Sequence, residues 1–134
     1  MDAAVIAAQY ISNIQSVVSR KVDPLKPAVV TIGKAVIGQR FNVIAEEVYL
    51  EGTVRTFDNE SRQIIEDALR AYAEGLAEAN SAEVIFEYVR MTQPVVNEEQ
   101  SAHLVQKVAE NAFGRENLYT EPPTMSAEDF GFYG

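Results

Sequence analysis

A long stretch of alternating side chains, residues 47–57, constrains the fold of this chain more than any other feature. Side chains that alternate with a period of two point to opposite faces of a β-strand. One face carries Val48, Leu50, Gly52 and Val54, and the other carries Tyr49, Glu51, Thr53, Arg55 and Phe57. The sequence therefore predicts a strand that covers a core with its first face, while its second face meets solvent or a ligand.

Three other segments carry apolar residues at helical spacing. They run over residues 2–19, from Asp58 or Asn59 to about residue 79, and over residues 98–112. Pro24 and Pro27 prevent the first helix from continuing, and Gly114 closes the third. The sequence thus predicts three amphipathic helices, with the alternating strand directly before the second.

Two further segments are predicted to be strands. Residues 28–36 are rich in β-branched side chains, and Gly33 within them indicates a bulge or the close approach of another backbone. Gly38 marks the turn that follows. Residues 83–91 alternate again and end before Pro94, so they are predicted to form a third strand.

The order of these elements is helix, strand, strand, helix, strand, then a helix and a tail. It predicts an α+β fold, a ferredoxin-like two-layer sandwich with an antiparallel sheet and two helices on one face, that lacks its first strand and adds a C-terminal helix and tail. The missing strand is central in that fold. Backbone groups on the strands beside it would need other partners: a neighbouring chain, a rearranged pairing or the C-terminal tail.

Composition excludes several functional classes. The net charge of −9, from 20 acidic and 11 basic residues, argues against nucleic-acid binding, because a phosphate backbone would be repelled. No apolar run approaches the roughly 20 residues that span a bilayer, and we expect no membrane association and no signal peptide. The absence of cysteine is compatible with the cytosol, so a cytoplasmic location is expected.

Three polar residues are candidates for a functional role, and each also has a purely structural interpretation. Asn42 follows the turn, where an asparagine commonly bonds turn backbone. Arg55 is either solvated or paired across the strand, but its guanidinium could hold a substrate carboxylate through two hydrogen bonds. His103 is the single histidine of the chain. Because a catalytic metal site typically takes three protein ligands, we expect His103 to be an exposed helical residue.

Three motifs then point to one family. They are Asn42-Val-Ile-Ala45, Gly52-Thr-Val-Arg-Thr56 and Met125-Ser-Ala-Glu-Asp-Phe130. In this order they resemble segments of the metal-dependent amidohydrolases and carboxypeptidases of the aminoacylase, hippurate hydrolase and indole-acetyl-amino-acid hydrolase type. The family usually has proline where this chain has Ala45. The resemblance implies that residues 1–96 match the lid or dimerisation domain, and that residues 97–134 match the segment that returns into the catalytic domain.

The resemblance also implies roles for individual residues. Asn42 and Arg55 would contact the substrate, and Met125, Glu128 and Asp129 would lie near the active-site cleft. Intact enzymes of this type use zinc or manganese to activate a water that attacks an amide carbonyl, which removes an acyl group from an amino acid or an amino acid from a small peptide. With one histidine and no cysteine, this chain is expected to contribute no metal ligand, no cofactor and no catalytic residue of its own.

Three functions remain open from the sequence. The first is a non-catalytic lid or dimerisation fragment of such an enzyme, present as a homodimer through its sheet edge or its helices. The second is one part of a metal-dependent amidohydrolase that is active only with a complementary chain. The third is an independent α+β interaction module that uses its exposed sheet.

Overall fold

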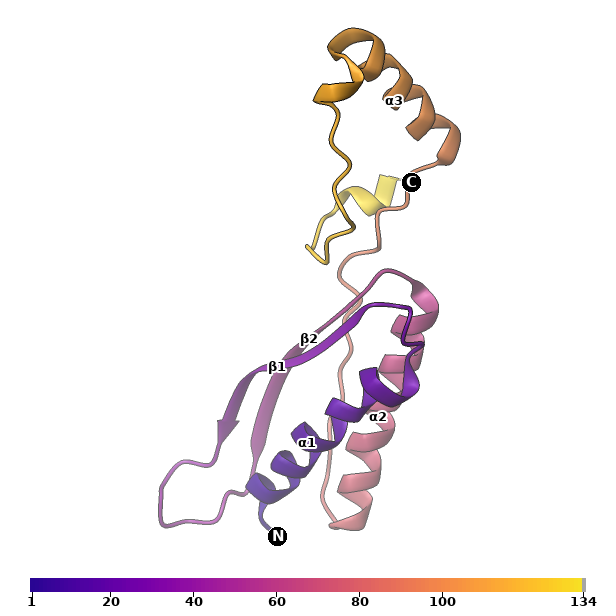
Figure 1. The fold of residues 1–134 in the computed structure, drawn as a ribbon. Coiled ribbons are helices and arrows are strands. Elements are labelled where there is room, and N and C mark those ends of the chain that lie inside the picture. Colours follow the sequence, from indigo (N-terminus) through magenta and orange to yellow (C-terminus); the bar gives the residue numbers. More distant parts are fainter. Residues whose placement is uncertain (134) are drawn as a thin grey trace. The chain divides into compact units, whose positions relative to one another are not determined.

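The computed structural model describes residues 1–133 and divides the chain into two compact units, Met1–Val89 and Arg90–Gly134 (Figure 1). The first unit holds helix α1 (Ala3–Lys21), strands β1 (Ala28–Ile37) and β2 (Val48–Thr56), and helix α2 (Asn59–Ala79). The second holds helix α3 (Glu99–Phe113) and two short 3-10 helices, Arg115–Asn117 and Phe130–Tyr133. This order confirms the predicted α+β class and all three predicted helices.

Carboxylates fix the starts of α1 and α2. Asp2 caps α1 by accepting a hydrogen bond from the Ala4 N–H at 3.0 Å. Of the two candidates for the second cap, Asp58 takes the position and accepts from the Ser61 N–H at 2.9 Å. Each helix therefore begins where its first unpaired backbone donors are satisfied, which the sequence predicted within one residue.

Strands β1 and β2 form an antiparallel hairpin whose register runs from Ala28 opposite Thr56 to Ile37 opposite Val48. The register shifts between Ile32 and Lys34, so a bulge lies at Gly33, which is one of the two predicted alternatives. Gly38 opens the turn after β1 with φ +57, a backbone angle that favours glycine. The bulge and the turn therefore fix which face of β2 meets the core.

The core of the first unit lies where α1 and α2 pack together and against the sheet. It consists of Ile14, Val17, Val22, Ile65, Ala68 and Leu69. Val30 and Ile32 from β1 and Val54 from β2 cover this cluster. Val48 and Leu50 are half-buried whereas Tyr49 and Glu51 are exposed, so the prediction of an inner and an outer face on β2 is confirmed for these residues.

The third predicted strand is wrong. Within residues 1–133 the sheet has two strands, β1 and β2, and residues 83–91 belong to neither. Their side chains still alternate as in a strand, because Phe86 and Tyr88 pack against the core while Glu87 and Val89 between and after them are exposed. A strand is defined by its ladder of hydrogen bonds, and the central neighbour that would supply this ladder is absent from the described chain.

Gly52 in β2 leaves no room for a side chain against β1. A Cβ atom on Gly52 would overlap the Thr31 carbonyl oxygen and would lie 3.0 Å from Ile32 Cδ1. A Cβ atom on Gly33, the glycine of the bulge, would meet nothing within 4 Å. The close approach that the sequence assigned to Gly33 as one of two options is therefore met at Gly52, the first residue of the Gly-Thr-Val-Arg motif.

We expect Gly52→Ala to destabilise the protein by about 1–3 kcal/mol, because the backbone of β1 must move to admit the methyl group. Gly33→Ala is the matched control, and its methyl group enters open space. Urea unfolding followed by circular dichroism measures both. Equal free energies of unfolding for the two variants would contradict the close approach at Gly52.

Helix α3 of the second unit is capped at both ends. Glu98 accepts hydrogen bonds from the N–H groups of Gln100 and Ser101 at 2.9 and 2.7 Å. These bonds lower the pKa of the Glu98 carboxyl. Gly114 ends the helix with φ +83. Among the described residues none on α3 is buried, and its apolar side chains Leu104, Val105 and Val108 are exposed.

Candidate functional site

Asn42 lies in the loop between β1 and β2 and is exposed. Its neighbours Phe41, Val43 and Ile44 are large apolar residues that are also exposed. Ala45 is the buried residue of this loop, and its carbonyl accepts a hydrogen bond from the Ala3 N–H at 3.0 Å. The loop thus presents an amide surrounded by apolar surface while it is attached to the start of α1. The signal for this surface in the sequence is the run of three large apolar residues, Phe41, Val43 and Ile44, in a segment that has neither strand nor helix periodicity.

Arg55 lies near the other end of β2, exposed on the outer face of the sheet and opposite Val29. It is seven residues from Val48, where the loop of Asn42 joins the strand, which corresponds to about 23 Å along an extended backbone. The two predicted substrate contacts are therefore placed at opposite ends of the hairpin. Within one chain the structure does not bring Asn42 and Arg55 together, so their shared role stays a prediction.

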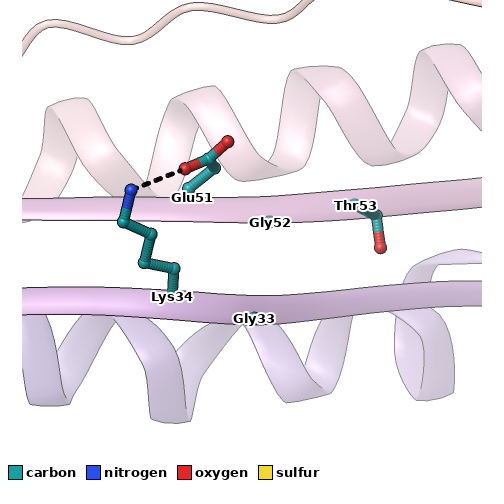
Figure 2. Close-up of a pocket in the computed structure, with 5 residues that line it drawn as sticks. All are labelled: Gly33, Lys34, Glu51, Gly52 and Thr53. Carbon is teal, nitrogen blue, oxygen red and sulfur yellow. Dashed lines mark hydrogen bonds and ion pairs between the residues drawn. The ribbon is translucent and has the colours of Figure 1, made fainter.

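A shallow depression lies between them on the hairpin, at the bulge. It is lined by Gly33, Lys34, Glu51, Gly52 and Thr53 and has a volume of about 210 Å³. Figure 2 shows the ion pair across it, in which Lys34 Nζ lies 3.4 Å from Glu51 Oε2. Ligand pockets usually enclose about 300–1,000 Å³. This depression is smaller and carries an exposed ion pair of little energetic value, so we assign it no ligand.

The outer face around this ion pair is more organised than the sequence suggested. Tyr49 donates its hydroxyl to Glu51 Oε2 at 3.2 Å, and Lys34 Nζ lies 5.1 Å from the centre of the Tyr49 ring. Sequence reasoning placed Tyr49 and Glu51 on one face but did not pair them with Lys34. The bulge at Gly33 sets Lys34 opposite Glu51, and this shift in register cannot be read from alternation alone.

Met125, Glu128 and Asp129 lie in the second unit, before and at the last short helix. Glu128 Oε1 accepts a hydrogen bond from the Phe130 N–H at 2.6 Å, and the Asp129 carbonyl accepts from the Phe132 N–H at 3.1 Å. Both acidic residues are exposed, and Met125 is half-buried. The structure therefore gives Glu128 and the backbone of Asp129 a local role in forming a turn, and the predicted position near a cleft remains a prediction.

The residues present do not fit a catalytic metal. In the described part of the chain, no three histidine, cysteine, aspartate or glutamate residues converge so that they could hold one ion. His103 is exposed on α3. Since catalytic zinc sites use about three protein ligands, no step of a metal-assisted reaction can be assigned to these residues.

Within residues 1–133 no helix is both long and apolar enough to cross a membrane.

Curated proteins similar to this chain are amide hydrolases. The chain is 39% identical over 132 residues to N-acetyldiaminopimelate deacetylase of Oenococcus oeni. This alignment covers 98% of the chain and 34% of the relative. The chain is also 34% identical over 133 residues to hippurate hydrolase of Campylobacter jejuni. That alignment covers 98% of the chain and 35% of the relative. No family model matches the chain.

Two solved structures of similar sequence share the fold of this chain. A protein of methicillin-resistant Staphylococcus aureus, assigned as an aminohydrolase, superimposes with a TM-score of 0.85 at 29% identity and covers 98% of this chain and 34% of its own. The YXEP protein of Bacillus subtilis, described as a dinuclear metal binding peptidase from the M20 family, superimposes with a TM-score of 0.71 at 30% identity, covering 99% and 34%.

These matches cover almost the whole chain but only part of each relative. Nearly every residue of the chain is aligned, and the fold is shared, but the chain spans about a third of the length of the curated relatives it matches. The predicted resemblance is therefore confirmed, and it concerns part of such a protein. The chain is homologous to these amidohydrolases and to a peptidase described as a member of the M20 family, and it spans about one third of their length.

Proposed function

We propose that this chain is a non-catalytic lid or dimerisation part of an amidohydrolase-type metallopeptidase. The proposal is supported most directly by two observations together. The chain aligns almost completely with a third of such a protein, and the donor residues within 1–133 do not fit a metal. Substrate contacts at Asn42 and Arg55 would then serve a catalytic centre held elsewhere. Zinc or manganese would belong to that centre.

The hairpin supports self-association. A two-stranded sheet is marginal in water by itself, and both strands have an edge without a β partner within residues 1–133. The outer face of the sheet also exposes Val29, Val36 and Tyr49. Exposed apolar surface of this kind is typical of protein interfaces. We infer a homodimer formed through the sheet edge or the helices.

The experiment is to purify the chain with added zinc or manganese and to measure its mass by light scattering and its hydrolysis of an N-acyl amino acid. We expect the mass of two chains and no hydrolysis above the metal-only blank. Stoichiometric metal binding with turnover by the chain alone would overturn the non-catalytic assignment. A strictly monomeric protein would contradict the dimerisation role.

A second candidate function is that of one part of an enzyme that is active only with a complementary chain. The apolar side of α3 favours it, because Leu104 and Val105 are 63% and 68% exposed in a helix whose ends are nevertheless well capped. Such a face needs cover. Mixing this chain with the ligand-bearing remainder of a relative and assaying amide hydrolysis tests this candidate, and inactivity in a well-formed complex would count against it.

A further inference from the structure

In the second unit, the chain after α3 returns to the backbone that precedes α3. The last short helix, Phe130–Tyr133, lies against Gln93 and Pro94 (Figure 1). A Cβ atom on Gly131 would lie 2.6 Å from the Gln93 carbonyl oxygen and 3.2 Å from the Pro94 carbonyl oxygen, whereas ordinary contacts of a Cβ atom begin at 3.4 Å. No side chain therefore fits at position 131 while both backbones keep their places. We call this close approach the Gly131 contact.

Proline makes one side of the Gly131 contact stiff. Gln93 and Pro94 belong to no helix or strand, so regular hydrogen bonding does not hold their backbone. The ring of Pro94 fixes its own φ near −65°, and its steric bulk keeps the preceding residue, Gln93, in the extended region. The Gln93 carbonyl consequently has little freedom to retreat, and a side chain at position 131 could be admitted only by a change elsewhere.

The other side of the contact is held together by local bonds. Glu128 Oε1 accepts from the Phe130 N–H at 2.6 Å, and the Asp129 carbonyl accepts from the Phe132 N–H at 3.1 Å. The rings of Phe130 and Tyr133 lie 5.9 Å apart, as expected for residues three apart in a 3-10 helix, whose side chains share one side. Residues 128–133 thus form one locally bonded piece, and its glycine is the residue that meets Gln93.

The two acidic residues of this piece differ in what their carboxylates do. The Glu128 carboxylate is engaged at the start of the short helix, where it accepts from the Phe130 N–H. The Asp129 side chain is exposed, and among the described residues its carboxylate makes no hydrogen bond or ion pair. Of the two, Asp129 is therefore the carboxylate that is available to a ligand or to another part of an enzyme.

We propose that Gly131 is a positioning residue, which fixes the place of the Asp129 carboxylate by allowing the last short helix to lie directly against Gln93 and Pro94. Residues 93–94 and 129 are far apart in the sequence, so local hydrogen bonds alone cannot keep them together, and closing the loop between them costs conformational entropy. The proposal rests on the proposed function, in which the segment of Asp129 lies near the active-site cleft. Gly131 itself touches no substrate and acts through Asp129.

A nitroxide label can report the position of Asp129. The chain has no cysteine, so Val95→Cys, at a residue that is 42% exposed and two positions after Gln93, carries the label alone. Successive Cα atoms are 3.8 Å apart, which keeps Asp129 within roughly 20 Å of residue 95 while the Gly131 contact is closed. In nuclear magnetic resonance spectra of the labelled, full chain, we expect the nitroxide to broaden the amide signal of Asp129.

Gly131→Ala in the labelled chain tests the contact. Its methyl group would overlap the Gln93 carbonyl oxygen, so we expect the short helix to move away and the broadening of the Asp129 signal to be lost. Gly33→Ala is the matched control, because its methyl group meets nothing within 4 Å, and it should keep the broadening. If Gly131→Ala kept the same broadening as this control, Gly131 would not position Asp129 and the proposal would fail.

A second substitution separates positioning from damage to the short helix. Pro94→Ala frees the backbone at residues 93 and 94, so the Gln93 carbonyl can retreat from the new methyl group. We expect the double variant Gly131→Ala/Pro94→Ala to regain part of the broadening that Gly131→Ala loses. The absence of any recovery would place the effect of the methyl group within the short helix and would overturn the proposal. These measurements involve neither hydrolysis nor the mass of the protein, so they can fail while the proposed function holds, and the reverse.

Discussion

Ile65→Ala is expected to cost about 2–5 kcal/mol of the free energy of unfolding, the range for deleting a fully buried isoleucine side chain. Ile65 on α2 is 0% exposed and belongs to the cluster that α1, α2 and the sheet share with Ile14 and Val17. Domains of this size are stable by only about 5–15 kcal/mol. The variant should therefore unfold at a much lower urea concentration, measured by circular dichroism at 222 nm.

The neighbouring residue provides the control. Ile64 is 37% exposed on the same helix, so Ile64→Ala removes the same atoms without leaving an enclosed cavity and should cost less than about 1 kcal/mol. Helix propensity rises equally in both variants, and the difference between them reports burial. If both variants lost the same stability, the assignment of α2's inward face would be wrong.

Asp58→Ala is expected to destabilise the protein by about 1–3 kcal/mol, through the loss of the α2 N-cap and of a buried hydrogen bond. Asp58 accepts from the Ser61 N–H at 2.9 Å and from the Ser61 hydroxyl at 2.7 Å. Ser61 is 1% exposed, so its hydroxyl would lose its partner where water cannot replace it. Asp67→Ala, which removes an exposed carboxylate from the same helix, should change stability by at most about 0.5 kcal/mol.

Acid should reproduce part of this effect. The backbone and side-chain hydrogen bonds from Ser61 lower the pKa of Asp58 below its ordinary value of 3.8, and Lys26 Nζ at 3.4 Å adds to the shift. A lowered pKa in the folded state means that ionised Asp58 stabilises the fold fully above about pH 4, and that this contribution is lost as the pH falls from there through the folded-state value. Urea unfolding at pH 7 and pH 3 measures the loss.

Asp58→Asn distinguishes the charge from the cap. Asparagine is as good an N-cap as aspartate, so this variant should keep more stability than Asp58→Ala at pH 7. It cannot ionise, and the part of the acid sensitivity due to residue 58 should disappear. A variant that kept the full difference in stability between pH 7 and pH 3 would assign that difference to other carboxylates.

The hairpin and helices of the first unit were predictable because their signals are local. Alternation gave the inner face of β2, prolines gave the end of α1, and a cap residue gave the start of α2 within one position. The bulge at Gly33 was also visible, as a glycine inside a β-branched run. In each case the side chains that decide the structure are neighbours in the sequence.

Residues 83–91 were predicted as a strand, and this failed because strand formation depends on a distant partner. Alternation correctly indicated which of their side chains face the core, as Phe86 and Tyr88 show. It carries no information about hydrogen bonding, which needs a neighbouring backbone. A pattern can therefore specify the burial of a segment while the state of its backbone is decided elsewhere.

For the candidate site, too, the sequence predicted the family but not the positions of the residues in space. The motifs identified the family, and the relatives confirm it. They did not indicate that Asn42 and Arg55 lie at opposite ends of one hairpin, because a motif preserves order along the chain and not distance in space. The pairing of Lys34 with Glu51 was missed for the same reason, since the bulge that aligns them shifts the register by one residue.

The hydrogen bond from Ala3 to the carbonyl of Ala45 has a practical use. It fastens the loop that carries Asn42 to the first turn of α1, two residues from Met1. A fluorophore coupled to the terminal amine would consequently sit beside this loop without replacing any of its side chains. Its emission would report, in real time, when the loop is covered by whatever approaches Phe41 and its apolar neighbours.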